Sequence, residues 1–186
     1  LDGAVTRVSN LPGVSAVQRY RLIDVRLAEV KLRLVATDTD VFLAQSRLQN
    51  KGWEAVAGAP LVPGELAAER SVVLSENAAR LLNVTAGDDL SLPTPEGRVN
   101  LRVRQVVVDF SSETGTAFMD LALFHRYFHD NAVDGLFVYV ERAHATDTVA
   151  SAIRAALSDG AHDSSVFVTQ TKSVERHMLD TVKRAF

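Results

Sequence analysis

Residues 138–186 close the sequence with four segments: Val138-Tyr139-Val140, Thr146–Leu157, Val166-Phe167-Val168 and Ser173–Phe186. Their apolar spacing predicts a strand, a helix, a second strand and a final amphipathic helix. The link from Tyr139 to Val168 is long enough for a parallel crossover, and such crossovers are right-handed. This order predicts an α/β arrangement at the end of the chain.

The last predicted helix keeps an apolar stripe up to its final residue, with Val174, Met178, Val182 and Phe186. Ordinary domains end in polar, frayed residues. We therefore expect the sequence to be a piece of a larger protein whose chain continues past Phe186.

The composition is that of a globular protein, because 47% of the 186 residues are hydrophobic and 23% are charged. The formal net charge of −3 provides no basic field for nucleic acid. The absence of cysteine excludes a disulfide framework and thiolate chemistry. The longest apolar runs, such as Val106-Val107-Val108, are far shorter than the roughly 20 residues of a membrane span. No signal-peptide pattern opens the chain.

The first sixty residues predict two helices and a pair of long strands. Helical spacing covers Asp2–Asn10, and alternation over Val14–Val35 predicts two strands joined by a turn. Thr37–Asn50 predicts a polar turn followed by a short helix. Trp53–Gly64 is interrupted by Gly and Pro and is predicted to be a loop.

Residues 71–130 predict three strands and two helices. The strands are expected at Ser71–Leu74, Leu90–Leu92 and Arg98–Phe110, and the helices at Glu76–Leu82 and Phe118–Asp130. Ser75 is expected to cap the first of these helices with its hydroxyl. The phase change at Val106-Val107-Val108 indicates a bulge or a strand buried on both faces.

Together these elements predict an α+β fold with two subdomains. Residues 1–60 and 132–186 would form an α/β sandwich of strand-helix-strand units. Residues 61–131 would form an inserted, β-rich subdomain.

His125 and His129 have the four-residue spacing that lets two imidazoles on one helix share a zinc ion. However, Arg126 occupies the place where a metalloprotease would carry its glutamate, and no third ligand is evident beyond Asp120 or Asp130. Two solvated histidines on the polar flank of a helix are the simpler interpretation. The sequence therefore predicts no metal ligand.

Other polar clusters also lack the spacing that chemistry requires. Ser111-Ser112-Glu113 is not set in a Gly-x-Ser-x-Gly elbow. Gly87-Asp88-Asp89 and Thr37-Asp38-Thr39-Asp40 lack the glycine and distal glutamate of a calcium loop, so turn chemistry explains them better. No phosphate-binding P-loop exists. The sequence therefore predicts no catalytic residue and no cofactor site.

Two further features have open interpretations. Four cations lie on or near the last predicted helix, where they would contact anionic headgroups or stabilise the helix C-terminus: Lys172, Arg176, Lys183 and Arg184. Trp53, the one tryptophan, would serve an interface or pack in the core, and core packing is the usual role.

Several segments occur in an order that is familiar as a set. They are Pro12-Gly13-Val14, Lys51-Gly52-Trp53-Glu54-Ala55-Val56-Ala57-Gly58, Val72-Val73-Leu74-Ser75-Glu76-Asn77-Ala78-Ala79, Ala86-Gly87-Asp88 before Leu90-Ser91-Leu92, and Met178–Phe186. Together they resemble the extracytoplasmic core domain of FtsX-like and MacB-like ABC transporter permeases, over essentially the whole chain. In that family the domain lies between the first two membrane helices.

The resemblance implies a porter-like, ferredoxin-like subdomain for residues 1–60 and 132–186, with a sabre-like insertion at residues 61–131. It implies a non-catalytic domain on the periplasmic side of the inner (plasma) membrane, in a permease that is dimeric and works with a cytoplasmic ATPase subunit. The implied partners are a periplasmic adaptor or a lipoprotein cargo, with no nucleic acid. The domain would relay ATPase-driven motion of the flanking membrane helices.

The sequence departs from the family pattern at two places. Ala59-Pro60 replace an arginine and an acidic turn, and Phe124–Gly135 is more similar to permeases with two such domains than to MacB itself. Two alternatives remain: a free-standing periplasmic ligand-binding protein, and a zinc-dependent hydrolase that uses His125 and His129.

Overall fold

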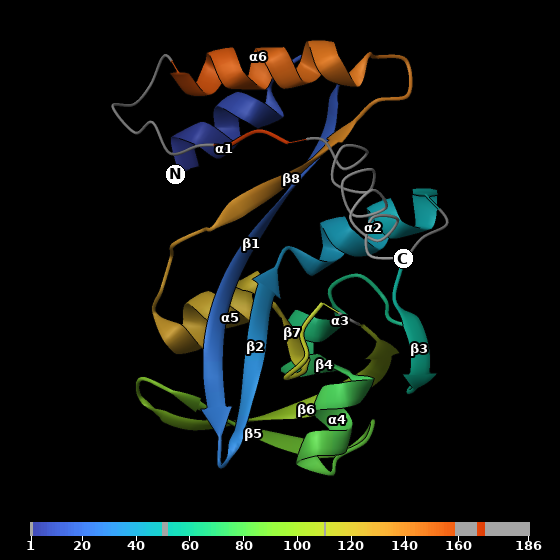
Figure 1. Ribbon diagram of the computed structural model, residues 1–186, viewed down its shortest axis with the longest axis vertical. Coiled ribbons are helices and arrows are strands. Elements are labelled where there is room, and N and C mark those ends of the chain that lie inside the picture. The colour runs from blue at the N-terminus through green and yellow to red at the C-terminus, as the bar shows by residue number, and fades with distance from the viewer. Residues whose placement is uncertain (1, 50–51, 110, 159–166, 170–186) are drawn as a thin grey trace, which may run out of the picture. The chain divides into compact units, whose positions relative to one another are not determined.

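The structure, a computed structural model, describes residues 2–49, 52–109, 111–158 and 167–169 (Figure 1). Its elements in chain order are α1 (Asp2–Ser9), β1 (Val14–Leu27), β2 (Val30–Thr37), α2 (Thr39–Gln49), β3 (Glu54–Ala57), α3 (Glu65–Ala68), β4 (Ser71–Ser75), α4 (Glu76–Leu82), β5 (Asp89–Thr94), β6 (Gly97–Val108), β7 (Thr116–Asp120), α5 (Leu121–Phe128), β8 (Gly135–Val140) and α6 (Thr146–Ser158). The predicted α+β class is confirmed.

The strands form one mixed sheet. Their order is β3-β6-β4-β7-β2-β1-β8, and β5 also pairs with β6. β2 runs parallel to β7, and β4 runs parallel to β6. The pairs β1–β2, β3–β6, β4–β7 and β5–β6 are antiparallel.

The chain divides into two compact units. Unit 1 consists of residues 1–17 and 138–186, and unit 2 consists of residues 18–137. The chain passes from one unit to the other within β1 and again within β8. These boundaries differ from the predicted ones near residues 60 and 132, and the assignment of porter-like and sabre-like subdomains stays a prediction.

Unit 1 is built around the helices α1 and α6, which lie side by side (Figure 1). Val8, Val149 and Ile153 form its buried core, each at most 6% exposed. Arg7 Nε donates to the carbonyl oxygen of Ala156 at 3.2 Å, so a polar contact also joins the two helices.

Unit 2 buries both faces of its central strands. Every residue of β4 and of β7 is buried. Because side chains alternate along a strand, Val72 and Leu74 pack with Leu121 and Phe124 of α5, whereas Val73 packs in a second cluster with Leu66 of α3. The helices therefore cover the sheet from both sides, which explains the continuous apolar runs of these strands.

Two local predictions are confirmed in this region. Ser75 caps α4, because its Oγ accepts a hydrogen bond from the Ala78 amide at 3.1 Å. The register of β4 and β6 shifts between the pairs Val72–Val103 and Val73–Gln105, so β6 carries a bulge. Residues 105–107 of β6 are also buried in succession. The apolar run Val106-Val107-Val108 therefore marks both a bulge and a strand segment that is buried on both faces.

Three sequence predictions of secondary structure are wrong. The predicted loop Trp53–Gly64 contains the strand β3, which pairs with the apolar end of β6. The predicted helix Phe118–Asp130 starts only at Leu121, because the preceding residues form β7 between β2 and β4. Asp120 then caps α5 by accepting from the Ala122 amide at 2.9 Å.

The third error concerns the predicted strand Val166–Val168 and its crossover. Residues 167–169 have no strand conformation. The carbonyl oxygen of Val168 accepts from the side chain of Arg154 at 3.2 Å, and the Val168 side chain packs against the core of unit 1. The predicted helix Ser173–Phe186 lies outside the described residues.

Among the residues that the structure describes, none of the helices combines the length and the apolar character that a membrane crossing requires.

Candidate functional site

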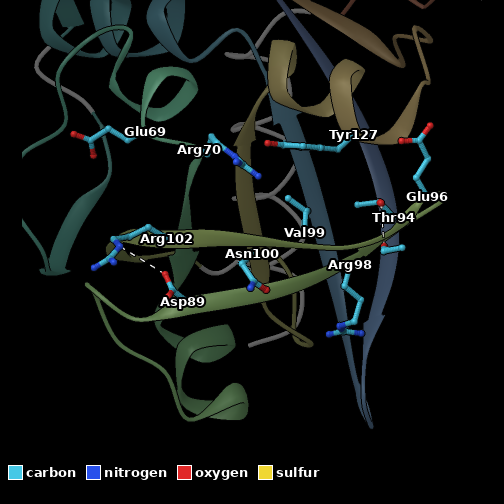
Figure 2. A pocket seen from close by; sticks show the side chains of 11 residues that line it. Glu69, Arg70, Asp89, Thr94, Glu96, Arg98, Val99, Asn100, Arg102 and Tyr127 are labelled. Atoms are coloured by element: carbon cyan, nitrogen blue, oxygen red, sulfur yellow. Dashed lines mark hydrogen bonds and ion pairs between the residues drawn. The ribbon is translucent and has the colours of Figure 1, made fainter.

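An open hollow of about 580 Å³ lies over the β5–β6 hairpin of unit 2 (Figure 2). Its walls come from the turn before β4, from β5 and β6, and from α5. The lining residues are Glu69, Arg70, Asp89, Thr94, Glu96, Gly97, Arg98, Val99, Asn100, Arg102 and Tyr127. Three arginines thus face three carboxylates, and the hollow is polar throughout most of its lining.

Two of the three arginines are engaged by neighbouring groups. Arg102 lies 3.6 Å from the carboxylate of Asp89 and donates to the carbonyl oxygen of Gly87 at 2.8 Å. Arg98 donates to the hydroxyl and the carbonyl oxygen of Ser91, at 2.9 and 2.6 Å. These side chains are held along the strand pair, as Figure 2 shows for Arg102 and Asp89.

Arg70 is the third arginine, and it lies over an aromatic ring. Its guanidinium carbon is 5.6 Å from the centroid of the Tyr127 ring, a cation–π distance. Figure 2 shows the two side chains pointing toward one another. Within the described ranges, no hydrogen bond or ion pair engages the Arg70 guanidinium, so its N–H donors remain available.

A second cluster, which we call the Arg21 clasp, consists of Arg21, Asp130 and Asp134 in unit 2. Arg21 of β1 forms ion pairs with Asp130 at 2.9 Å and with Asp134 at 2.7 Å. Asp134 also accepts from the Leu22 amide at 2.7 Å. The clasp ties the segment between α5 and β8 to β1.

The surroundings shift the pKa of two residues of the clasp, Asp130 and Arg21. The Ala132 amide, followed by Arg21, holds the pKa of Asp130 below its ordinary value against the effect of burial. The hydrogen bond with Asp130 raises the pKa of Arg21. Asp130 and Arg21 are therefore both charged at neutral pH. The role of the clasp is structural, since it holds two chain segments together.

Arg104 of β6 makes a similar contact with the first residue of α3. It donates to Glu65 Oε1 at 2.8 Å, and Glu65 also accepts from the Val62 amide at 3.0 Å. The hydrogen bond from Arg104 is the largest cause that lowers the pKa of Glu65. This pair fastens α3 to β6.

The structure does not place His125 and His129 together on a helix. α5 ends at Phe128, and His129 follows it with a left-handed backbone (φ 52°). Its Nε2 lies 2.8 Å from Glu96, whereas His125 Nε2 is buried and has no hydrogen-bond partner among the described residues. The four-residue helical spacing on which the zinc alternative depends is therefore absent.

The polar clusters at 37–40 and 87–89 serve the local structure. Asp38 pairs with Arg19 at 2.7 Å, and Thr39 donates to the buried carboxylate of Asp120 at 2.5 Å. Asp88 accepts from the Thr85 amide at 2.8 Å. The Ser111 hydroxyl donates to the carboxylate of Asp109, two residues earlier, at 2.7 Å. In the described part of the chain, no group of three or more potential ligands could hold a metal ion.

Trp53 takes the packing role. Its ring lies between Phe42 and Phe118, with centroids 4.4 and 4.7 Å away. The cations Lys172, Arg176, Lys183 and Arg184 lie outside the described residues, so their two interpretations stay open.

Sequence analysis missed Arg70, Tyr127 and the Arg21 clasp. The contact between Arg70 and Tyr127 joins the turn before β4 to α5, and the clasp joins β1 to the segment after α5. Neither contact is local in sequence, so no spacing motif marks it. The left-handed backbone of Arg70 (φ 51°) cannot be predicted from the sequence either. Glycine is the usual residue in that conformation, and an arginine gives no sign of it.

Comparison with known proteins identifies the fold and the family. The family model described as the MacB-like periplasmic core domain matches residues 2–156. The crystal structure of the periplasmic region of MacB from Actinobacillus actinomycetemcomitans has a similar fold, with a TM-score of 0.69 at 12% identity over 94% of this chain and 80% of that one.

The extracellular domain of the noncanonic ABC-type transporter YknZ from Gram-positive bacteria is also similar. Its TM-score is 0.58 at 13% identity, over 80% of this chain and 75% of that one. No curated protein matches the sequence. The chain belongs to the family of MacB-like periplasmic core domains, the periplasmic domains of ABC transporter permeases.

Proposed function

We propose that the chain is the extracytoplasmic domain of an FtsX/MacB/LolE-like permease, held at the inner (plasma) membrane by flanking membrane helices. The family match over residues 2–156 carries this proposal. The likeness in fold to the MacB periplasmic region supports it.

In this proposal the domain itself is not catalytic. ATP hydrolysis belongs to a separate cytoplasmic subunit, and the full-length permease acts as a dimer. The domain binds a periplasmic adaptor or a lipoprotein cargo and relays to it the motion of the membrane helices.

The division of the chain into two units supports a relay. Residues 2–17 and 138–158 belong to the same unit, where α1 packs against α6. Within the described residues the chain passes between the units in β1 and in β8, so these strands give motion of one unit a covalent path to the other. Rigid bodies joined by few strands are a common arrangement for transmitted motion.

Two linkers of the sequence, near Ala59–Pro63 and near Asn131–Asp134, are further candidates for hinges, and both lie inside unit 2. Leu61 is buried, and Asp134 belongs to the Arg21 clasp. The proposed pivots are therefore residues 17–18 and 137–138, where the chain passes between the units.

Spin labels in the full-length permease, assembled with its ATPase subunit in membranes, test this proposal. Arg142→Cys in unit 1 and Thr114→Cys in unit 2 are exposed labelling positions. We expect ATP to change the distance distribution between the labels, and a membrane-impermeant reductant to quench both labels from the extracytoplasmic side. Labels on the cytoplasmic side would contradict the location, and an unchanged distribution would contradict the relay.

A further inference from the structure

We propose that the hollow over the β5–β6 hairpin binds an extended segment of a partner protein, and that Arg70 receives an acidic side chain of that segment. The inference rests on the proposed function, because it gives the chemistry of the partner. It depends on Arg70, Tyr127 and the charges around them.

Three constraints hold Arg70 in place before any partner arrives. Its backbone has the left-handed conformation (φ 51°), and its carbonyl oxygen accepts from the Arg102 amide at 3.2 Å. Its guanidinium lies over Tyr127, whose half-buried ring packs against the core of unit 2. A left-handed backbone is uncommon for a residue other than glycine and often marks a functional position.

The cation–π contact leaves the hydrogen-bonding capacity of Arg70 unused. A guanidinium carries five N–H donors in a fixed fork that matches the two oxygens of a carboxylate. The cation–π contact with Tyr127 supplies no oxygen acceptor to these donors. Since no acceptor among the described residues takes them, Arg70 is preorganised for a bidentate carboxylate.

The neighbouring charges favour a single acidic side chain over a polyanion. Arg98 and Arg102 already donate to Ser91 and Gly87, and Asp89 lies beside Arg102. Glu69, 3.7 Å from Arg104, and Glu96, 2.8 Å from His129, add carboxylates to the walls. These carboxylates would repel a run of acidic residues. A single carboxylate bound at Arg70 would instead have its charge neutralised by the guanidinium.

The shape and lining of the hollow favour a polypeptide over a small molecule. Pockets for small molecules are enclosed and mostly apolar, and they bury most of the ligand. This hollow is open and polar, with the exposed side of β6, including Asn100, as part of its lining. An extended segment covers such a surface and gains polar contacts along its length.

Peptide titration of the whole chain, followed by NMR, tests the proposal. The probes are the peptide acetyl-Ala-Ser-Glu-Ser-Ala-amide, the same peptide with Gln in place of Glu, and free acetate. We expect saturable shifts at Arg70 Nε and the Tyr127 ring with the Glu peptide, and about tenfold weaker binding of the Gln peptide, since charged hydrogen bonds are the stronger class. Acetate binding as tight as the Glu peptide would overturn the choice of a polypeptide.

Variants separate a role for Arg70 from a general effect of charge. Arg70→Gln should weaken the Glu peptide about tenfold, and Tyr127→Leu should weaken it while an apolar side chain remains at that position. Arg26→Gln is the matched control, because Arg26 is exposed on β1 and has no ion pair within the described residues. Equal binding by wild type and Arg70→Gln, with the fold intact by NMR, would overturn the proposal.

The two experiments fail separately. The spin-label distances do not involve Arg70, so a permease that moves with ATP but ignores the Glu peptide refutes only the docking site. A permease without ATP-dependent motion whose domain binds the peptide through Arg70 refutes only the relay.

Discussion

Arg21 and Arg104 each meet two carboxylates, yet they fasten different parts of unit 2. Arg21 holds the segment after α5 through Asp130 and Asp134, and Arg104 holds α3 mainly through Glu65. All of these side chains keep part of their surface in solvent. We therefore expect each pair to contribute modestly to stability, on the order of 1 kcal/mol.

The lowered pKa of Asp130 makes a prediction about pH. Because the pKa of Asp130 is lowered in the folded state, the unfolded chain binds this proton more tightly than the folded chain does. The resulting stability is therefore present above the ordinary pKa of aspartate, about 4, and is lost as the pH falls below that value. Asp130→Asn should reduce the free energy of unfolding at pH 7 by about 1 kcal/mol and should flatten its decline between about pH 5 and pH 2. Urea unfolding across that range measures both effects.

Glu113→Gln is the control for this experiment. The Glu113 side chain is exposed and makes no hydrogen bond or ion pair in the part of the chain that the structure describes. An equal flattening of the pH profile by Glu113→Gln would mean that the clasp is not its source.

For single residues, the sequence predicts a contact correctly when the two residues that form it are close along the chain. Ser75 was predictable as a cap because its hydroxyl reaches the Ala78 amide three residues on. Arg70 was not predictable, since Tyr127 approaches it only after the sheet and α5 have packed. Distant contacts decide the candidate site, so the sequence contains little signal for it.

Among the elements, β7 shows why apolar spacing misassigns a buried strand. Phe118 faces one core cluster, while Ala117 and Met119 face the other. A strand that is apolar on both faces lacks the alternation of a surface strand, and it merges with the stripe of the following helix. The exposed alternation of β1 and β2, by contrast, was sufficient to predict both strands.

The short strand β3 depends on a glycine at its end. Gly58 has a φ of 95°, and a Cβ added there would lie 2.5 Å from the carbonyl oxygen of Arg104 in β6. Gly64 has a φ of 80°, but a Cβ there would meet nothing within 4 Å. Both positions carry the cost of a left-handed alanine, and only the first adds a backbone clash.

We therefore expect Gly58→Ala to be more destabilising than Gly64→Ala. The left-handed backbone should cost about 1 kcal/mol at either position. The clash with β6 should add about 2 kcal/mol at Gly58, in the range of overpacked sites. Denaturant unfolding of the two variants measures the difference, and equal losses would show that β3 moves away from β6 without cost.

For the whole molecule, the two compact units divide the chain at other residues than the predicted subdomains do, and those subdomains stay a prediction. The predicted boundaries near residues 60 and 132 follow changes in composition and turn residues. The boundaries of the compact units fall inside β1 and β8, where an unbroken strand pattern gives no sign of them. Nothing local marks the residue at which a strand stops packing with one core and starts packing with another.

The two cores predict separate local stabilities. Ile153→Ala should remove about 3 kcal/mol from unit 1, since Ile153 is only 6% exposed. Hydrogen exchange should then accelerate in α1 and α6 while β4 and β7 keep their protection. Leu101→Ala, at a fully buried position of unit 2, should give the opposite pattern. Uniform acceleration in both variants would mean that the units unfold as one.

The place of β3 at one end of the strand order has a consequence for handling the protein in solution. In the part of the chain that the structure describes, β3 pairs with β6 alone, and Val56 at its centre is 52% exposed. An unpaired edge with an apolar side chain invites self-association by strand addition between molecules. Its length of four residues and the charge of Glu54 limit that tendency. Concentrated samples should therefore associate weakly and reversibly through this edge, and a lysine at position 56 should keep them monomeric.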